Sequence, residues 1–363
     1  MSSTTTAPPN TQGGAPRRQE RSSGGSSLGR YIAMRALLII PTVFILVTVV
    51  FIVMRATGDP ITAKLGDKLP PAQLAEAIHN AGYDRPWFVQ YVEYLGQIFT
   101  GNFGTTGDNR PVVEILVTYG TATLELAVYA LLVAFIVGIP LGMLAAYVRD
   151  RWGDAVLRVF AILCYATPVF FAGMLLKLVF SVWLGVLPVA GRASTGSELE
   201  MQFLPFSTGI YTIDAFLTGD PAVIGDVLRH AVLPAIALGL LTAGVFLRLV
   251  RTNVIGTLST DYVDAARSRG VAERRLVTKH AYRPALIPIV TVIGLQIALL
   301  LGGAVLTETT FEWKGLGFML AEFLKARDFA AVQGIVAMLA VIVALTNFVV
   351  DIIAALIDPR VRY

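Results

Sequence analysis

Six long apolar runs alternate along the chain with segments that carry its charges, glycines and prolines. The first run, Ala36–Met54, has 19 residues without a charge. As an α-helix it would be roughly 28 Å long, close to the thickness of the hydrocarbon core of a bilayer. Each of the others is also long enough to cross, so the pattern predicts six spans and an all-α, polytopic fold. The other five runs cover about residues 121–148, 155–183, 231–250, 285–307 and 331–356.

Proline and glycine recur within or at the start of these runs. Membrane helices tolerate both residues, and glycine lets neighbouring helices approach closely. The pattern therefore favours a packed helix bundle without indicating any one activity. The prolines are Pro41, Pro140, Pro168, Pro234 and Pro288, and the glycines are Gly138, Gly142, Gly239, Gly244, Gly294, Gly302 and Gly303.

Composition excludes a soluble globular domain. Hydrophobic residues make up 55% of the chain and charged residues 15%, and the mean hydropathy is +0.68. Soluble domains have a smaller apolar share and a charged share nearer a quarter. The pI is about 9.2, but the basic residues are spread over the flanks of the spans. We therefore expect membrane lipid, and not nucleic acid, to surround them.

The distribution of basic residues predicts the orientation. One side of the membrane would hold the N-terminus, the 149–154 loop, the 251–284 loop and the C-terminus, and with them 18 of the 29 lysines and arginines. Basic flanks face the cytoplasm. We therefore expect a multi-pass protein of the cell (plasma or inner) membrane with both termini in the cytoplasm.

Four segments lie outside the spans. Residues 1–28 are rich in Ser, Thr, Gly and Pro and lack an apolar h-region, which predicts a disordered cytoplasmic tail and not a signal peptide. Residues 57–115 include a stretch of helical spacing at 71–80 and an aromatic-rich stretch at 86–94, which predicts a small folded external cap on the permeation path. Residues 185–230 form an acidic external loop, and 251–284 a basic cytoplasmic loop.

The cytoplasmic loop contains a short, well-bounded helix. Ser259 or Thr260 can cap it, Asp261 and Asp264 lie in its first turn, and Arg267 and Arg269 in its last, before Gly270. Spacings of three and four place Tyr262, Ala265, Ala266 and Arg269 on one face. That face offers two small residues for close approach by another protein and an aromatic anchor. The alternative is an amphipathic helix lying on lipid headgroups.

Sequence motifs for catalysis or cofactor binding are missing. The chain has no phosphate-binding loop of the G-x-x-x-x-G-K-[ST] kind, no G-x-S-x-G and no H-E-x-x-H. Its single cysteine, Cys164, cannot form an intrachain disulfide. Its histidines, His79, His230 and His280, are far apart and indicate no metal cluster. We expect a non-catalytic chain with no cofactor of its own; if it is driven by ATP, a partner ATPase must bind the ATP and Mg²⁺.

Five polar residues lie in or near the predicted spans. Glu125, Lys177 and Asp351 are close enough to helix ends to reach the interface, which favours a structural role for each. Gln296 and Asn347 lie deeper and are better candidates for lining a permeation path. Hydrogen bonding between helices is an equally good use of these two side chains.

Asp264-Ala265-Ala266 with Gly270 resembles the EAA loop of ABC importer permeases, and an ordered set of further motifs resembles the B-type permeases of the dipeptide, oligopeptide and nickel branch. Asp264 stands where the family has glutamate, and the long N-terminal tail departs from the usual pattern. Both departures leave partner-specific details open. The further motifs are Gly58-Asp59-Pro60, residues 187–192 (LPVAGR), 230–234 (HAVLP), 283–288 (RPALIP), 308–317 (ETTFEWKGLG), 326–328 (ARD) and 358–363 (DPRVRY).

The resemblance implies a type I, MetI-like permease fold of six helices that forms half of a translocation pore. It also implies a homologous second permease, two cytoplasmic ATPase domains, an extracytoplasmic substrate-binding protein and a peptide substrate. Residues 261–270 would couple the chain to the ATPases.

Two other classes of function stay open at this stage. A proton-coupled secondary transporter would use Glu125 or Asp351 as a relay, and a membrane scaffold would bind partners without transport. Within the resembled family, nickel chelates and other peptide-like cargo are alternatives to peptides, and nothing in the sequence indicates a preferred peptide length.

Overall fold

The computed structural model describes residues 24–56, 58–66, 68–106 and 110–357, apart from some side chains, about half of them in α13. This part of the chain is helical and has no β-strand, with one isolated bridge between Thr105 and Pro111. The long helices are α1 (Gly24–Ala56), α5 (Val112–Tyr147), α10 (Pro221–Leu258), α13 (Tyr282–Phe311) and α15 (Phe329–Ile357).

Among the described residues, four helices are long and apolar enough to cross a membrane: α1, α5, α10 and α15. A bent pair, α6 (Trp152–Ala166) with α7 (Val169–Leu176) and the π-helix Lys177–Trp183, is a fifth candidate. The remaining predicted span, 285–307, falls on α13, a helix of 30 residues. At 1.5 Å per residue α13 is about 45 Å long, which is enough to cross.

The predicted 155–183 run is wrong as a single straight span, because its two helices meet at 106°. Thr167 adopts an extended conformation, with ψ of 126°, directly before Pro168. Proline disfavours helical backbone in the residue before it and has no N–H to continue the ladder. The same residue type is accommodated inside α5 and α10, at Pro140 and Pro234.

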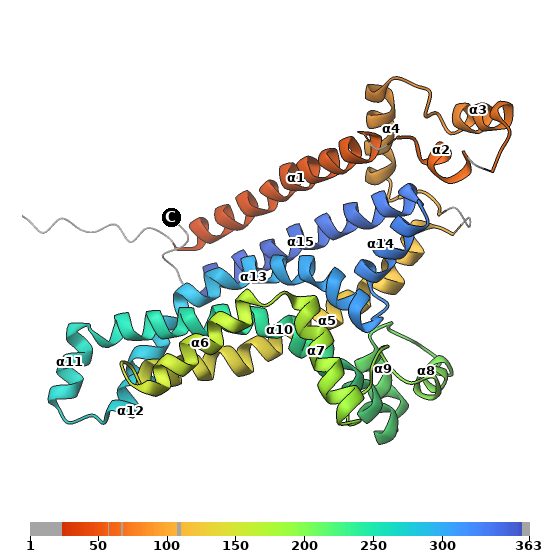
Figure 1. Cartoon of the computed structure of the whole chain (residues 1–363). Coiled ribbons are helices and arrows are strands. Elements are labelled where there is room, and N and C mark those ends of the chain that lie inside the picture. Colours follow the sequence, from red (N-terminus) through yellow and green to blue (C-terminus); the bar gives the residue numbers. More distant parts are fainter. Residues whose placement is uncertain (1–23, 57, 67, 107–109, 358–363) are drawn as a thin grey trace, which may run out of the picture.

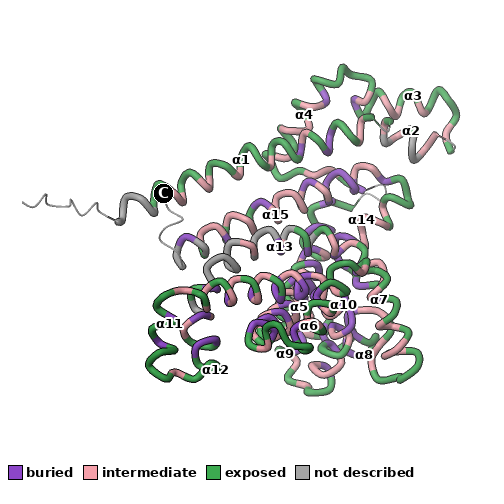
Figure 2. Tube along the Cα trace, turned by 60° about the vertical axis from the view of Figure 1, so that its left-hand side comes forward, coloured by how far each residue is buried: buried purple, intermediate pink, exposed green. Residues whose placement is uncertain are grey.

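The bundle is centred on α10, which packs against α5, α13 and α6 (Figure 1). Glycines permit the closest of these contacts. A Cβ on Gly142 would lie 2.6 Å from Cβ of Val250, and one on Gly239 would lie 2.6 Å from the carbonyl oxygen of Ala130. The buried residues accordingly gather along α5 and α10, whereas α1 packs mainly along α15 and keeps a largely exposed surface (Figure 2).

The two ends of the bundle carry different short helices (Figure 1). One end, the α11 end, has α11 (Asp261–Ser268), α12 (Glu273–Arg275) and a π-helix at Leu276–Ala281. The opposite end has α2 (Pro60–Leu65), α3 (Pro71–Asn80), α4 (Trp87–Phe99), α8 (Thr195–Gln202), α9 (Tyr211–Thr218) and α14 (Leu316–Lys325). The first described residues of α1 and the last of α15 both lie toward the α11 end.

The segment between α1 and α5 is folded into helices, as its spacing predicts. α3 matches the 71–80 stretch, and α4 contains most of the aromatic stretch. α4 packs on α1 through aromatic contacts, with the ring centroids of Phe51 and Tyr91 5.2 Å apart. The hydroxyls of Thr48 and Tyr91 are also hydrogen-bonded, at 2.5 Å.

Two predicted boundaries need correction. α1 begins at Gly24, inside the stretch 1–28 that we expected to be disordered, and residues 1–23 lie outside the described part. α10 begins at Pro221, so the last ten residues of the predicted 185–230 loop are helical. Asp220 explains the early start, because its carboxylate accepts a hydrogen bond from the N–H of Ala222 at 2.7 Å and so caps the helix. Pro221 suits the first helical position.

Candidate functional site

The loop that joins α10 to α13, residues 259–281, is a compact unit that we call the α11–α12 loop. Asp261 and Asp264 lie in the first turn of α11 and Arg267 in its last, as predicted. Gly270 has φ of +81°, a conformation that favours glycine and ends the helix. Thr260 occupies the N-cap position, but its hydroxyl donates to the carbonyl of Thr257 at 2.6 Å and does not cap α11. The predicted side-chain cap is therefore wrong.

The inner face of α11 is apolar and attached to the bundle. Val263 and Ala266 are buried against Leu276, with Leu258 at the end of α10 packed beside them. Leu258 also contacts the larger cluster that fills the space between α5, α10 and the start of α13. A displacement of α11 would therefore act directly on the ends of three long helices.

Ala266 is the main correction to the predicted docking face. The sequence placed it with Ala265 on the outer face, but only 3% of its surface is exposed. Ala266 is four residues after Tyr262 and three after Val263, so either stripe can contain it. The larger apolar side chain of Val263 decides which stripe faces the bundle. The outer face consists of Asp261, Tyr262, Asp264, Ala265, Arg267, Ser268 and Arg269, all exposed, with Gly270 beside it.

Hydrogen bonds and ion pairs close the loop on itself. The Arg267 guanidinium pairs with Asp264 in α11 and, at 3.2 Å, with Glu273 at the start of α12. The hydrogen bonds that Arg267 donates to the Glu273 carboxylate raise the pKa of Arg267 above its ordinary value. Tyr262, 47% exposed, donates its hydroxyl to the carbonyl of His280 at 3.2 Å. The loop is thus a preformed unit with a charged outer surface.

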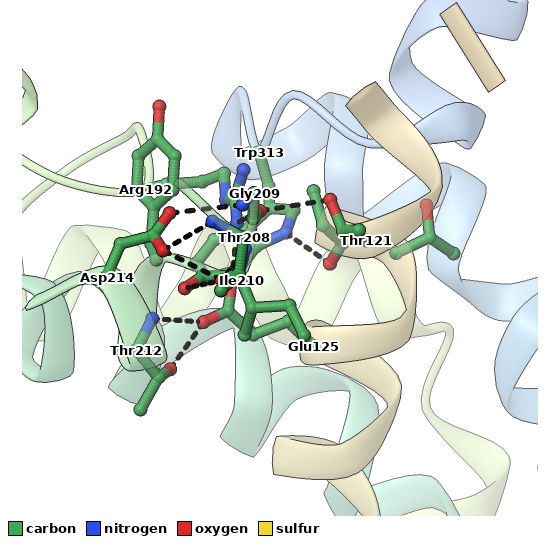
Figure 3. A network of polar contacts seen from close by, with 12 residues as sticks. Thr121, Glu125, Arg192, Thr208, Gly209, Ile210, Thr212, Asp214 and Trp313 are labelled. Atoms are coloured by element: carbon green, nitrogen blue, oxygen red, sulfur yellow. Dashed lines mark hydrogen bonds and ion pairs between the residues drawn. The ribbon is translucent and has the colours of Figure 1, made fainter. Parts of the chain in front are cut away.

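At the opposite end, a buried ion pair fixes the 185–220 segment to α5. The Glu125 carboxylate accepts a hydrogen bond from Nη2 of Arg192 at 2.6 Å and one from the N–H of Thr212 at 2.7 Å (Figure 3). The Thr212 hydroxyl donates to the same carboxylate. Glu125 and Arg192 are each only 6% exposed. The expectation that the Glu125 side chain reaches the membrane interface is therefore wrong, because the carboxylate is buried and is paired there with Arg192.

Aromatic rings and backbone groups surround Arg192. Its guanidinium lies 3.6 Å from the centroid of the Tyr211 ring and 5.5 Å from that of Trp313. Its Nη2 also donates to the carbonyl of Gly209 at 3.1 Å. The buried Asp214 carboxylate orders the neighbouring turn by accepting bonds from the N–H groups of Thr208 and Gly209, at 2.8 and 3.1 Å (Figure 3). The segment is a fixed structure and not a free loop.

Glu308, near the end of α13, is a buried residue to which the sequence assigned no role. Its carboxylate accepts from the hydroxyl of Thr123 at 2.7 Å and from the N–H of Phe318 at 2.9 Å. Thr123 in turn accepts from the N–H of Leu316 at 2.8 Å. Together they satisfy N–H groups in the first turn of α14, which that helix cannot satisfy itself. The signal in the sequence was a carboxylate at the end of an apolar run, followed by G-L-G at 315–317.

Of the remaining polar residues singled out from the sequence, Asn347 and Asp351 line one pocket, and Lys177 and Gln296 lie elsewhere. Lys177 donates to the carbonyl of Thr310 at 2.8 Å, and Asp351 pairs with Arg35 at 3.1 Å. Asn347 lines a small pocket with Arg35 and Asp351, between α1 and α15. Gln296 is buried in α13, and its Oε1 has no hydrogen-bond partner among the described residues. That either residue lines a permeation path stays a prediction.

Within the described residues, no three side chains of His, Cys, Asp or Glu gather to hold a metal ion. The α11–α12 loop and the Glu125–Arg192 network lie at opposite ends of the bundle. Neither places a nucleophile, a base and a substrate pocket together in the way that an enzyme active site requires. Both are suited to holding or contacting other parts of an assembly.

Comparison with known families gives two matches that cover most of the chain. Residues 138–363 match the family described as the inner membrane component of binding-protein-dependent transport systems. Residues 28–114 match the N-terminal region of such membrane components.

Curated relatives match over nearly their full length. The "Di/tripeptide transport system permease protein DppB" of Pseudomonas aeruginosa is 39% identical over 92% of this chain and 98% of its own. The "Dipeptide transport system permease protein DppB" of Escherichia coli K12 is 38% identical over 92% and 99%. The "Glutathione transport system permease protein GsiC" of Salmonella choleraesuis is 33% identical over 92% and 99%.

A solved structure supports the fold. A chain of the MetNI methionine ABC transporter, in an inward-facing conformation, superposes with a TM-score of 0.52 and 15% identity. The match covers 68% of this chain and 97% of the other. At that identity the likeness concerns the fold alone.

Proposed function

The chain belongs to the family of inner membrane components of binding-protein-dependent transport systems, and from this membership we propose that it is the permease subunit of an ATP-driven importer of dipeptides and related short peptides. The relatives named for dipeptides and tripeptides, which match 92% of this chain, support that substrate class. Nickel chelates and other peptide-like cargo are the alternatives within the family.

The observation that carries the proposal is the two-sided α11–α12 loop. Its inner side is packed on the ends of α5, α10 and α13 through Leu258, Val263 and Leu276. Its outer side presents charged residues and the small residue Ala265. A partner that grips the outer side can displace three spans together, which is what coupling to an ATPase requires.

In the proposed cycle two cytoplasmic ATPase domains bind and hydrolyse ATP with Mg²⁺ and move α11 as they close. A second, homologous permease completes the pore, and the two permeases alternate between inward-open and outward-open states. This chain contributes rigid contacts and a path, and it takes no covalent part in the reaction. Ala265 supplies the close approach, while Asp261, Asp264 and Arg269 supply the complementary charge.

The proposed orientation places the α11 end and both termini in the cytoplasm. The α8–α9 end then faces outward, where an extracytoplasmic binding protein delivers the peptide. A pocket of about 700 Å³ at that end is lined by Arg192, Glu198, Tyr211 and Lys314, among others. Its walls are held in place by the Glu125–Arg192 pair, which supports its use as a fixed docking surface.

The test is uptake of a labelled dipeptide by the reconstituted complex, with ATP enclosed on the α11 side. We expect Ala265→Glu to abolish ATP-coupled uptake and binding of the ATPase subunits while the permease stays folded. The matched control is Ala326→Glu, which adds the same charge at an exposed alanine on the opposite end. Normal coupled uptake by the Ala265→Glu complex would contradict the docking assignment.

A proton-coupled transporter is the competing class, with Glu125 or Asp351 as a relay. Both carboxylates are ion-paired, to Arg192 and Arg35 respectively, which supports a structural role for each. Uptake by this chain alone, dependent on a proton gradient and independent of ATP, would overturn the importer proposal in favour of this one.

A further inference from the structure

A groove of about 370 Å³ lies between α6 and α10, toward the α11 end of the bundle. Its floor is apolar, formed by Ala161, Ile162, Tyr165 and Leu247. Its rim carries three arginines, Arg158, Arg248 and Arg251. Neither the coupling role of the α11–α12 loop nor the network at the opposite end accounts for this combination.

Among the described residues, a single carboxylate, that of Asp154, forms an ion pair with any of these three arginines. Asp154 is fully buried and accepts two hydrogen bonds from Arg251, at 2.6 and 2.7 Å. Arg158 is 3.7 Å from the same carboxylate with 54% of its side chain exposed. Arg248 is exposed and has no ion-pair partner among the described residues. The groove therefore keeps positive charge that its own side chains do not neutralise.

The position of the groove along α10 is that of a membrane interface. Residues 231–247 carry no charge, and Arg248 is the first charged residue after them. Helix α6 enters from the same side, with Asp154 and Arg158 in its first turns and apolar residues after them. The arginines thus lie at the depth of lipid headgroups, and the apolar floor lies at the depth where acyl chains begin.

We propose that this groove binds an anionic phospholipid, with the phosphate held by Arg158 and Arg248 and an acyl chain lying against Ile162 and Tyr165. Arg251 is paired with Asp154, so it adds to the positive charge of the groove but does not hold the phosphate. Basic pockets between helices on the cytoplasmic side of a membrane suit anionic headgroups. The assignment of the lipid to the cytoplasmic leaflet rests on the orientation in the proposed function, whereas the lipid site itself is inferred from the groove alone.

The assembled complex, purified and placed in nanodiscs, provides the test. Retained lipids are counted by native mass spectrometry after exchange into phosphatidylglycerol with phosphatidylcholine, or phosphatidylcholine alone. We expect the Arg158→Gln, Arg248→Gln double variant to bind phosphatidylglycerol roughly 25-fold more weakly, at about fivefold for each arginine near the surface. Arg251 is left intact because removing it would strand the buried Asp154 carboxylate.

Arg149→Gln is the matched control, since it removes an exposed arginine at the same end but outside the groove. Phosphatidylglycerol retention should be unchanged by it. Because the readout is binding, a complex that fails to transport peptide still tests the lipid site, and the two proposals fail separately.

Four results would overturn the lipid proposal. Equal retention of phosphatidylglycerol by the double variant and the original chain would show that the two arginines do not bind the lipid. Equal retention of phosphatidylglycerol and phosphatidylcholine would show that the groove binds acyl chains without preference for an anionic headgroup. Displacement of phosphatidylglycerol by inorganic phosphate at low concentration would indicate a soluble anion site. Cross-linking of a cysteine introduced at Ile162 to the second permease would show that a protein covers the groove.

Discussion

The α11–α12 loop and the 185–220 segment are both connections between long helices, yet they are attached in opposite ways. The first is held at its back by apolar side chains and keeps its ion pairs on the surface. The second is held to α5 by a buried ion pair with aromatic cover. Exposed ion pairs contribute little to stability, whereas a buried pair is costly to disrupt once formed. The comparison indicates that the first connection leaves its charged face accessible, whereas the second is fixed to its neighbouring helix.

The largest effect is expected from a change that disrupts the buried ion pair between Glu125 and Arg192. Glu125→Gln leaves the Arg192 guanidinium buried without its counter-charge, which should cost about 3–5 kcal/mol of stability. Thermal unfolding of the purified chain in detergent measures this loss. Glu114→Gln, at an exposed position on the same helix, is the control and should leave the transition temperature unchanged. Equal transition temperatures for the two variants would mean that the pair does not fix the segment.

The next effect separates the two faces of α11. Ala266→Glu places a carboxylate among Val263 and Leu276, which should destabilise the α11–α12 loop by at least about 2 kcal/mol. Ala265→Glu, one residue away on the exposed face, should leave it folded. Limited proteolysis of the loop in the isolated chain distinguishes them, with rapid cleavage expected only for Ala266→Glu. Similar cleavage of both variants would contradict the assignment of inner and outer faces.

A third prediction concerns the helices that join the two regions. Gly142→Ala would place a Cβ 2.8 Å from the carbonyl oxygen of Leu247 on α10, and such overpacking should cost about 1–3 kcal/mol. Gly225→Ala on α10 meets nothing within 4 Å and, by removing a helical glycine, should be neutral or stabilising. Transition temperatures of the two variants provide the measurement. A stable Gly142→Ala variant would mean that α5 and α10 separate more easily than their packing indicates.

The smallest expected effect tests the exposed ion pairs. Arg267→Gln removes the contacts to Asp264 and Glu273, and because these are exposed, the transition temperature should hardly change. The contribution of the pairs should weaken further in high salt. A large, salt-independent loss of stability would remove the contrast between the two regions.

Local patterns in the sequence predicted the elements well. The apolar runs match α1, α5, α10, α13 and α15, and the 71–80 spacing matches α3. The bend at Thr167 was missed because prolines are accommodated inside other spans, so Pro168 alone did not identify a break. Ala266 was misplaced because it belongs to two helical stripes, and only the packing of Val263 against Leu276 selects one.

Non-local contacts were the part that the sequence could not supply. Glu125 and Arg192 are 67 residues apart, and Glu308 and Thr123 are 185 apart. No local period connects either pair. A carboxylate near the end of an apolar run looks the same whether it turns to water or meets a buried partner from a distant segment. The polar network in Figure 3 therefore became visible only in three dimensions.

The pairing of α1 with α15 has a consequence for biosynthesis. These two helices lie side by side, and the ion pair between Arg35 and Asp351 joins nearly the two ends of the chain. Because α15 follows α1 with the other long helices between them, the ribosome makes both partners of this contact only after it has made those helices. A product that ends before α15 would leave α1 without its main partner, and exposed, unpaired surface of this kind makes an incomplete chain prone to misassembly.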